Sequence, residues 1–255
     1  RTFGFPATAT STIGFAGGDD HVYRLTITTG GILEYAWPLA VRVPSVSAEQ
    51  AQTADSPPSV ELFGWNIPDA AKRVSLESDG SKESATVWHA EFTGTIPVRF
   101  EPHPAIVEHE PNGRETAQQV SLPVAITGRI DPPRDVDIYQ FPAKKGDKLL
   151  FRAEARSLGF PLDPFLRLTD ASGKTLTEVD DSGGGRDGDL SFEAPADGEY
   201  RLMIRDLHGH GGDRYVYRLN ATHVRSDFNL RVAADSFVLT PGKPLEIPVT
   251  VERLN

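Results

Sequence analysis

The 255-residue sequence contains no cysteine, and this absence removes several kinds of chemistry at once. Without cysteine the chain has no disulfide framework, no thiolate nucleophile and no zinc site of the cysteine type. Many exported bacterial proteins also lack cysteine, so its absence does not assign the chain to the cytosol.

Positive charge and long apolar runs are also scarce. Lysine and arginine number 26 against 36 aspartates and glutamates, which gives a formal net charge of −10. An acidic chain is a poor partner for nucleic acid, because affinity there depends on basic groups that neutralise phosphate. No run of 18 apolar residues occurs, so we expect no insertion into a membrane.

Glycine and proline are abundant instead, with 23 and 20 residues, while only 38% of the residues are apolar. This composition favours many short strands joined by tight turns. Apolar residues alternate with polar ones in residues 149–155, 200–204 and 217–221, as in strands with one buried face. With turns rich in glycine and aspartate between such runs, the pattern predicts an antiparallel β-sandwich of eight or nine strands from Val120 to Val224.

One nine-residue stretch occurs twice. The sequence GGDDHVYRL spans residues 17–25 and GGDRYVYRL spans residues 211–219, with seven of the nine positions identical. The second copy ends a predicted β-domain, so the first is expected to end a similar one. Few residues precede the first copy, and residues 1–43 are therefore predicted to be the last strands of a truncated module.

The sequence divides into four predicted segments. Residues 1–43 are the truncated module, and residues 44–106 form a proline-rich linker and a small immunoglobulin-like β-domain. Residues 107–224 form the sandwich, and residues 225–255 are the first strands of a further truncated module. We expect both ends to lie as strands against the middle domains, against each other or against a neighbouring chain, because a lone hairpin is marginal in water. Self-association through unpaired strand edges is a related expectation.

Four aromatic residues are expected to form the core of the small domain: Trp65, Trp88, Phe92 and Phe100. The alternative for the two tryptophans is a platform on which sugar rings stack.

Six stretches in the third segment carry a family resemblance. In order they are EHEPNGRETAQ, ITGRIDPPRDVDIYQF, KKGDKLLF, LDPFLRLTDASGKTL, FEAPADGEYRLMI and YVYRL. Together they resemble the bacterial pre-peptidase C-terminal (PPC) domain family over residues 108–224. The resemblance implies a jelly-roll-like β-sandwich, usually appended to secreted proteases or other exported hydrolases. It also implies an extracellular, cell-surface or periplasmic location.

The resemblance further implies a calcium site. Some family members hold calcium at an N-terminal E-x-E-P-N stretch, which here supplies Glu108, Glu110 and Asn112. These three side chains point the same way in an extended segment. Asp135 and Asp137 form a second pair with the same period. Five side chains, with backbone carbonyls and water, could supply the six to eight oxygens that Ca²⁺ takes.

Two residues weaken this prediction. Gly113 and Arg114 stand where calcium-binding relatives continue with another asparagine or aspartate. The alternative is a solvated acidic linker that joins two sandwiches.

Other motifs are set aside. His208 and His210 have the spacing of a metal pair, but Arg214 and Tyr215 stand where a cupin-like site needs further ligands, so a loop is predicted. The acidic stretch at residues 180–189 is predicted to be a plain turn rather than a calcium loop. No G-x-S-x-G elbow, H-E-x-x-H helix or glycine-rich phosphate loop occurs.

The function expected from the sequence is that of a non-catalytic accessory or binding fragment of a large exported bacterial protein. Its expected partners are a parent hydrolase domain or an extracellular protein or polysaccharide. One alternative is a structural spacer of a cell-surface array with no ligand. Another is an unrecognised hydrolase, since paired catalytic carboxylates carry no local motif.

Overall fold

The computed structural model describes most of the chain. The described residues are 27–43, 57–77, 82–182, 187–224, 228–232, 234, 236–238, 242 and 244–253, together with two short paired strands, Phe3–Gly4 (β1) and Gly14–Phe15 (β2). Helical structure in these residues is limited to two single 3₁₀ turns, Asp69–Ala71 (η2) and Arg156–Leu158 (η3). The all-β prediction is therefore confirmed. Among the described residues no helix is both long and apolar enough to cross a membrane.

The first copy of the repeated stretch, residues 17–25, lies outside the described residues. The second copy is described and leads into the last strand of the larger of two sandwiches.

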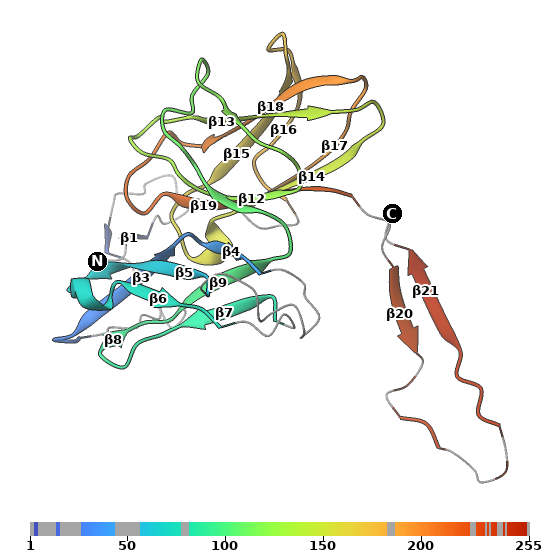
Figure 1. Ribbon diagram of the computed structural model, residues 1–255, viewed down its shortest axis with the longest axis horizontal. Coiled ribbons are helices and arrows are strands. Elements are labelled where there is room, and N and C mark those ends of the chain that lie inside the picture. The colour runs from blue at the N-terminus through green and yellow to red at the C-terminus, as the bar shows by residue number, and fades with distance from the viewer. Residues whose placement is uncertain are drawn as a thin grey trace.

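The larger sandwich consists of two five-stranded sheets, which form the upper part of Figure 1. One sheet has the order β10-β12-β19-β14-β17 and the other has the order β11-β13-β18-β15-β16. The strands are Ala105–Val107 (β10), Gln118–Gln119 (β11), Val124–Arg129 (β12), Asp137–Ala143 (β13), Lys148–Glu154 (β14), Pro164–Asp170 (β15), Thr175–Val179 (β16), Gly188–Glu193 (β17), Gly198–Asp206 (β18) and Val216–His223 (β19). The eight strands from β12 to β19 match the number predicted.

The core of this sandwich follows the alternation of the sequence. From β14, Leu149 and Phe151 point inward, with exposed fractions of 0% and 1%. Phe151 meets Phe141 of the opposite sheet, with 5.3 Å between the ring centres. Burying a large apolar side chain of this kind contributes about 1.5–3 kcal/mol, so the two inner faces hold the sheets together.

The smaller sandwich has a four-stranded sheet in the order β6-β5-β3-β8 and a three-stranded sheet in the order β4-β9-β7. Its strands are Gly31–Trp37 (β3), Ala40–Arg42 (β4), Ser59–Trp65 (β5), Arg73–Ser75 (β6), Ser84–Val87 (β7), Phe92–Thr93 (β8) and Ile96–Glu101 (β9). We call it the small domain.

The predicted boundary at residue 43 needs correction. The strands β3 and β4 precede it, yet β3 pairs with β5 and β4 pairs with β9, so residues 31–42 belong to the small domain. The alternation of apolar residues predicts that a segment is a strand and which face is buried. It does not name the pairing partner, and these partners lie beyond the proline-rich linker.

The tryptophans of the small domain also differ from expectation. Trp65 and Trp88 are both 67% exposed, whereas Phe92 and Phe100 are buried as predicted. Trp65 ends β5 opposite Ile32, which is itself 37% exposed, so this pair lies on the outer face of the sheet. Aliphatic side chains occupy most of the core instead, including Leu33, Val60, Leu62, Val87, Ile96 and Val98.

A buried domain interface joins the two sandwiches. Tyr35 of β3 stacks on Phe63 and meets the edge of Phe160 from the large sandwich, with ring centres 4.8 and 6.1 Å apart. Beside them the backbone N–H of Leu39 donates to Thr127 Oγ1 at 3.0 Å. The segment after β9 then adds β10 to the edge of the large sandwich by parallel pairing with β12.

An ion pair crosses the same interface. The Nε of Arg218, in β19, donates to Glu101 Oε1 at 3.0 Å, and its Nη1 contacts Glu154. The side chains of Arg218 and Glu101 are only 7% and 5% exposed. The interface therefore combines apolar packing with a buried charge pair.

The C-terminal end forms a hairpin of its own from Phe228–Val232 (β20) and Val249–Arg253 (β21), which Figure 1 shows apart from the two sandwiches. Its apolar side chains pair across the strands, Leu230 with Val251 and Val232 with Val249, and all four are at least half exposed. Among the described residues these two strands pair only with each other, so the expectation that this end would lie against the middle domains or against the other end is wrong.

Candidate metal site

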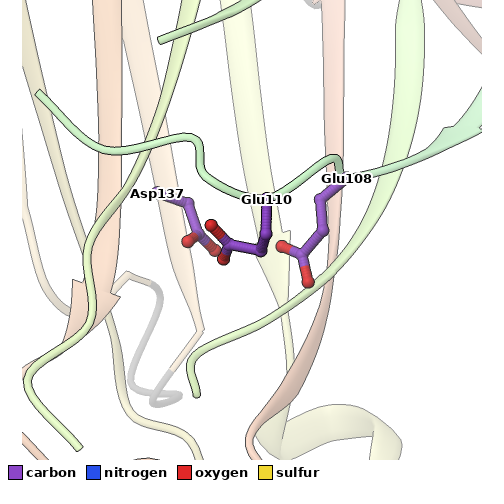
Figure 2. A group of neighbouring side chains, drawn as sticks. All are labelled: Glu108, Glu110 and Asp137. Atoms are coloured by element: carbon purple, nitrogen blue, oxygen red, sulfur yellow. The ribbon is translucent and has the colours of Figure 1, made fainter. Parts of the chain in front are cut away.

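Three carboxylates meet where the segment that leaves the small domain passes the large sandwich. Glu108 and Glu110 follow β10, and Asp137 opens β13 in the opposite sheet. Figure 2 shows the carboxylate of Glu110 between those of Asp137 and Glu108. Each side chain contributes one carboxylate oxygen, and these three oxygens all lie within 4.8 Å of one another. The structure thus brings together three of the five ligands predicted from the sequence.

Asn112 completes this cluster from the same extended segment. Its side chain is fully buried, and its backbone carbonyl accepts a hydrogen bond from Ile138 N at 2.8 Å, which ties the segment to β13. One of the two terminal atoms of its side-chain amide lies 3.3 Å from Glu110 Oε2 and 3.1 Å from Asp137 Oδ1. With nitrogen on that side the amide donates to both carboxylates, and with oxygen on that side it becomes a fourth oxygen ligand. The assignment of the two atoms follows from hydrogen bonding alone.

Asp135 is used differently. Its Oδ2 accepts from Asp131 N at 3.1 Å and its Oδ1 accepts from Val136 N at 2.8 Å. Both oxygens therefore close the turn before β13, as aspartate commonly does. The structure does not bring this side chain into the cluster, although its charge acts on Glu110 and Asp137.

Two buried tyrosines, which the sequence analysis did not identify as site residues, are hydrogen-bonded to the cluster. Tyr217 O–H donates to Asp137 Oδ2 at 2.5 Å, and the hydroxyls of Tyr139 and Tyr217 are 2.6 Å apart. Gly128 makes room for them, because a Cβ there would lie 2.3 Å from the Tyr217 ring and 2.6 Å from Glu108 Oε2. The repeated VYRL stretch, which contains Tyr217, is the sequence signal that could have found this residue.

Burial raises the pKa of all three acids. Loss of hydration raises the pKa of Asp137 to about 9, and the charge of Glu108 adds to this shift. The same loss of hydration raises the pKa of Glu108 to about 7. The pKa of Glu110 is also raised by loss of hydration, with a contribution from the charge of Asp135. The three groups can all be ionised at neutral pH only if a positive charge compensates them.

This predicts a pH dependence of the metal-free protein. Glu108 and Asp137 have folded-state pKa values above their unfolded values, so between about pH 4 and pH 9 the folded chain binds more protons than the unfolded chain. The free energy of unfolding therefore falls as the pH rises through this window. We expect a melting temperature several degrees lower at pH 8 than at pH 5 in the presence of a chelator.

Two variants check this assignment by thermal denaturation. Asp137→Asn should make the dependence weaker, because of the two groups only Glu108 then still ionises within this window. Asp213→Asn should keep it, because the Asp213 side chain is 90% exposed. A melting temperature that rises from pH 5 to pH 8 in the unsubstituted protein contradicts the prediction.

Residues 135–206 match the family model of the bacterial pre-peptidase C-terminal domain. The match runs through β13 to β18, so it contains Asp137 and ends before Tyr217. The chain therefore carries a PPC domain within its large sandwich, and the resemblance found in the sequence is confirmed. Domains of this family occur in exported proteins, often C-terminal to secreted peptidases.

A probable subtilase-type serine protease of Deinococcus radiodurans is 47% identical to this chain over 73 residues. The aligned stretch is 28% of this chain and 10% of the protease. The chain thus spans about a tenth of the length of this curated relative.

Solved structures with partial similarity include a domain of a collagenase and two inhibitors of lysozyme. The pre-peptidase C-terminal domain of a collagenase from Bacillus anthracis covers 41% of this chain and 93% of its own, with 16% identity and a TM-score of 0.33. A mutant of the Escherichia coli periplasmic inhibitor of g-type lysozyme covers 48% of this chain and 100% of its own, with 17% identity and a TM-score of 0.30. The corresponding inhibitor from Salmonella Typhimurium covers 42% and 98%, with 17% identity and a TM-score of 0.28.

Proposed function

We propose that this chain is a non-catalytic accessory part of an exported bacterial protein, in which both sandwiches act as one unit beside a parent hydrolase domain. The PPC match supports the accessory role, because such domains often follow secreted peptidases. The buried domain interface supports a single unit, because it combines the packing of Tyr35 with the ion pair of Arg218. The proposed place of action is extracellular, at the cell surface or in the periplasm.

Calcium is the ion proposed for the carboxylate site, and the convergence of oxygen ligands carries this proposal. Ligand atoms no more than 4.8 Å apart fit around an ion with metal–oxygen distances of about 2.4 Å, the range of Ca²⁺. Mg²⁺ has shorter distances of about 2.0–2.1 Å and needs a tighter cluster. The carboxylates of Glu108, Glu110 and Asp137 with the amide oxygen of Asn112 supply four ligands, and water can complete the shell.

The bound ion would fix the connection between the domains. Glu108, Glu110 and Asn112 belong to the segment that leaves the small domain, whereas Asp137 belongs to a central part of the large sandwich. Calcium would therefore replace the repulsion between these carboxylates by a link across the junction. Extracellular calcium would hold the accessory unit in one arrangement.

Asp137→Asn tests the site directly. The substitution keeps the shape of the side chain but removes one carboxylate, so we expect calcium affinity measured by isothermal titration calorimetry to fall at least tenfold. Asp135→Asn is the matched control, because both oxygens of Asp135 serve a turn, and its affinity should change less than threefold. The metal-free Asp137→Asn protein should stay folded, because it lacks a carboxylate that burial disfavours. Equal losses in the two variants would reject the proposed ligand set.

Polysaccharide is the ligand proposed for the small domain. Trp65 and Trp88 each expose 67% of their surface, and exposed tryptophan rings offer flat faces on which sugar rings can stack. A structural spacer has no need for two exposed tryptophans. This observation supports a binding role over the spacer alternative.

A pull-down with insoluble polysaccharides tests this role. We expect Trp65→Ala and Trp88→Ala each to lower retention on the bound polymer at least fivefold. Ile27→Ala is the control, since Ile27 is an exposed apolar residue at 87% and should leave retention unchanged. A chain that binds no polymer at all, or variants that bind as well as the unsubstituted chain, would favour the spacer.

A further inference from the structure

A second group of side chains with metal-binding chemistry lies at the turn that follows β18. The group consists of Asp163, His208 and His210, and it shares no ligand with the carboxylate site. The spacing of the two histidines alone predicted only a loop, and the chain does form a turn there. The antiparallel pairing of β15 with β18 adds the aspartate, because Pro164 lies opposite Asp206.

Asp206 builds this turn and holds the histidines in place. Its side chain is buried, and its Oδ1 accepts from the backbone N–H groups of His208 at 3.0 Å and His210 at 2.8 Å. Gly209 between them has φ +74°, a conformation that favours glycine. The turn leaves the two histidine side chains 60% and 63% exposed, with ring centres 6.0 Å apart.

Asp163 supplies a buried carboxylate beside these rings. Its side chain is only 8% exposed, and its Oδ2 lies 3.7 Å from His208 Nε2. Its Oδ1 is buried and has no hydrogen-bond partner among the residues that the structure describes. A buried carboxylate oxygen without a partner is destabilising, so a compensating group is expected beside Asp163. The nearest cationic side chain is Arg156, whose Nη2 is 3.9 Å from Oδ2.

We propose that Asp163, His208 and His210 bind one divalent transition-metal ion of the zinc type. Imidazole nitrogens with a carboxylate oxygen are ligands that Zn²⁺ and Ni²⁺ accept and that Ca²⁺ does not select. Ligand atoms around a tetrahedral zinc ion are about 3.3 Å apart, close to the 3.7 Å between Asp163 Oδ2 and His208 Nε2. Two imidazoles on one such ion have ring centres about 5 Å apart, against 6.0 Å here, so the exposed His210 ring would have to turn toward His208 and leave Asp206 Oδ1, which now lies 3.5 Å from its Nδ1.

Three protein ligands leave one position open to water or to a group from another molecule. Because both histidine rings are exposed, that position faces solvent. The site would therefore suit contact with a carboxylate or imidazole group of a protein partner. This inference does not depend on the proposed calcium site.

Isothermal titration calorimetry of the full chain with ZnCl₂ tests the proposal, with saturating CaCl₂ present to occupy the carboxylate site. We expect one equivalent of Zn²⁺ to bind with micromolar affinity. His208→Ala should weaken binding at least tenfold, and its fold should persist because its backbone N–H still donates to Asp206. His223→Ala is the matched control, since His223 is an exposed histidine at the end of β19.

A second variant is expected to change the zinc affinity in the opposite direction. Arg156→Ala removes the cation beside Asp163 and should strengthen zinc binding several-fold, whereas a nonspecific histidine site would not respond. The proposal is supported if His208→Ala weakens and Arg156→Ala strengthens binding. It is overturned if no binding occurs below millimolar zinc, if His208→Ala binds as tightly as the unsubstituted chain, or if Arg156→Ala has no effect.

Discussion

Arg218→Ala is expected to lower the free energy of unfolding by about 3–5 kcal/mol, the usual loss when one partner of a buried ion pair is removed. Arg218 donates to Glu101 and contacts Glu154, and these two carboxylates are only 5% and 14% exposed. Without the guanidinium, the buried carboxylate of Glu101 loses its ion-pair partner and retains only the contact with His103, whose Nε2 lies 3.4 Å from its Oε2. For a protein of this size the loss corresponds to a melting temperature roughly ten degrees lower.

Arg152→Ala is the matched control for this prediction. Arg152 also binds a carboxylate with good geometry, since its Nε and Nη2 donate to Asp189 at 2.9–3.1 Å. Its side chain is 50% exposed, however, and surface ion pairs of this kind contribute only about 0–1 kcal/mol. Urea denaturation of both variants measures the difference. Losses of equal size would show that the domain interface does not depend on the buried pair.

Removal of calcium is expected to lower the melting temperature of the unsubstituted chain by about 5–10 °C. A ligand that binds only the folded state stabilises it according to its concentration relative to the dissociation constant. With millimolar calcium and a site of about 10 μM, the stabilisation is about 2.7 kcal/mol. Bound calcium should also slow hydrogen exchange at two backbone N–H groups: that of Ile138, which donates to the Asn112 carbonyl and joins this segment to β13, and that of Asn112, which donates to Glu110 Oε2.

Melting curves in calcium, in magnesium and in chelator separate the possible results. We expect calcium alone to raise the midpoint, because the ligand atoms are spread for the larger ion. Asp137→Asn should show nearly equal midpoints with and without calcium. Equal midpoints in the unsubstituted chain would leave residues 108–112 as an acidic linker, and Arg114 would then be the first residue to replace.

The fold of the large sandwich could be predicted because its signals are local. Alternation at Leu149, Phe151 and Ala153 identified β14 and its buried face, and all three side chains are at most 1% exposed. Turns rich in glycine and aspartate separated the strands. The small domain was predicted less well, because β3 pairs with β5 across a linker and no local pattern specifies that pairing.

The candidate site divides in the same way. The period of two correctly placed Glu108, Glu110 and Asn112 on one face, because that geometry is a local property of an extended segment. Asp135 shares the period with Asp137, but its carboxylate satisfies two backbone N–H groups of its own turn. The part played by Tyr217 depends on the packing of β19 against β12 and β13, which only the three-dimensional structure shows. The sequence predicted that Trp65 and Trp88 would be buried, and both are exposed. Hydrophobic character alone does not decide which face of a sheet a residue occupies.

Two neighbouring residues of the repeated stretch make contacts on opposite faces of β19. Tyr217 points into the large sandwich and reaches Asp137, whereas Arg218 points outward and reaches Glu101 of the preceding domain. The first copy of the stretch contains Tyr23 and Arg24 at the corresponding positions. A genetic duplication that copies this strand therefore copies a residue of the domain interface together with a residue of the carboxylate site. Modules of this kind could be recombined as pairs with the domain that precedes them, and chimaeras cut between residues 101 and 218 would separate a buried charge from its partner.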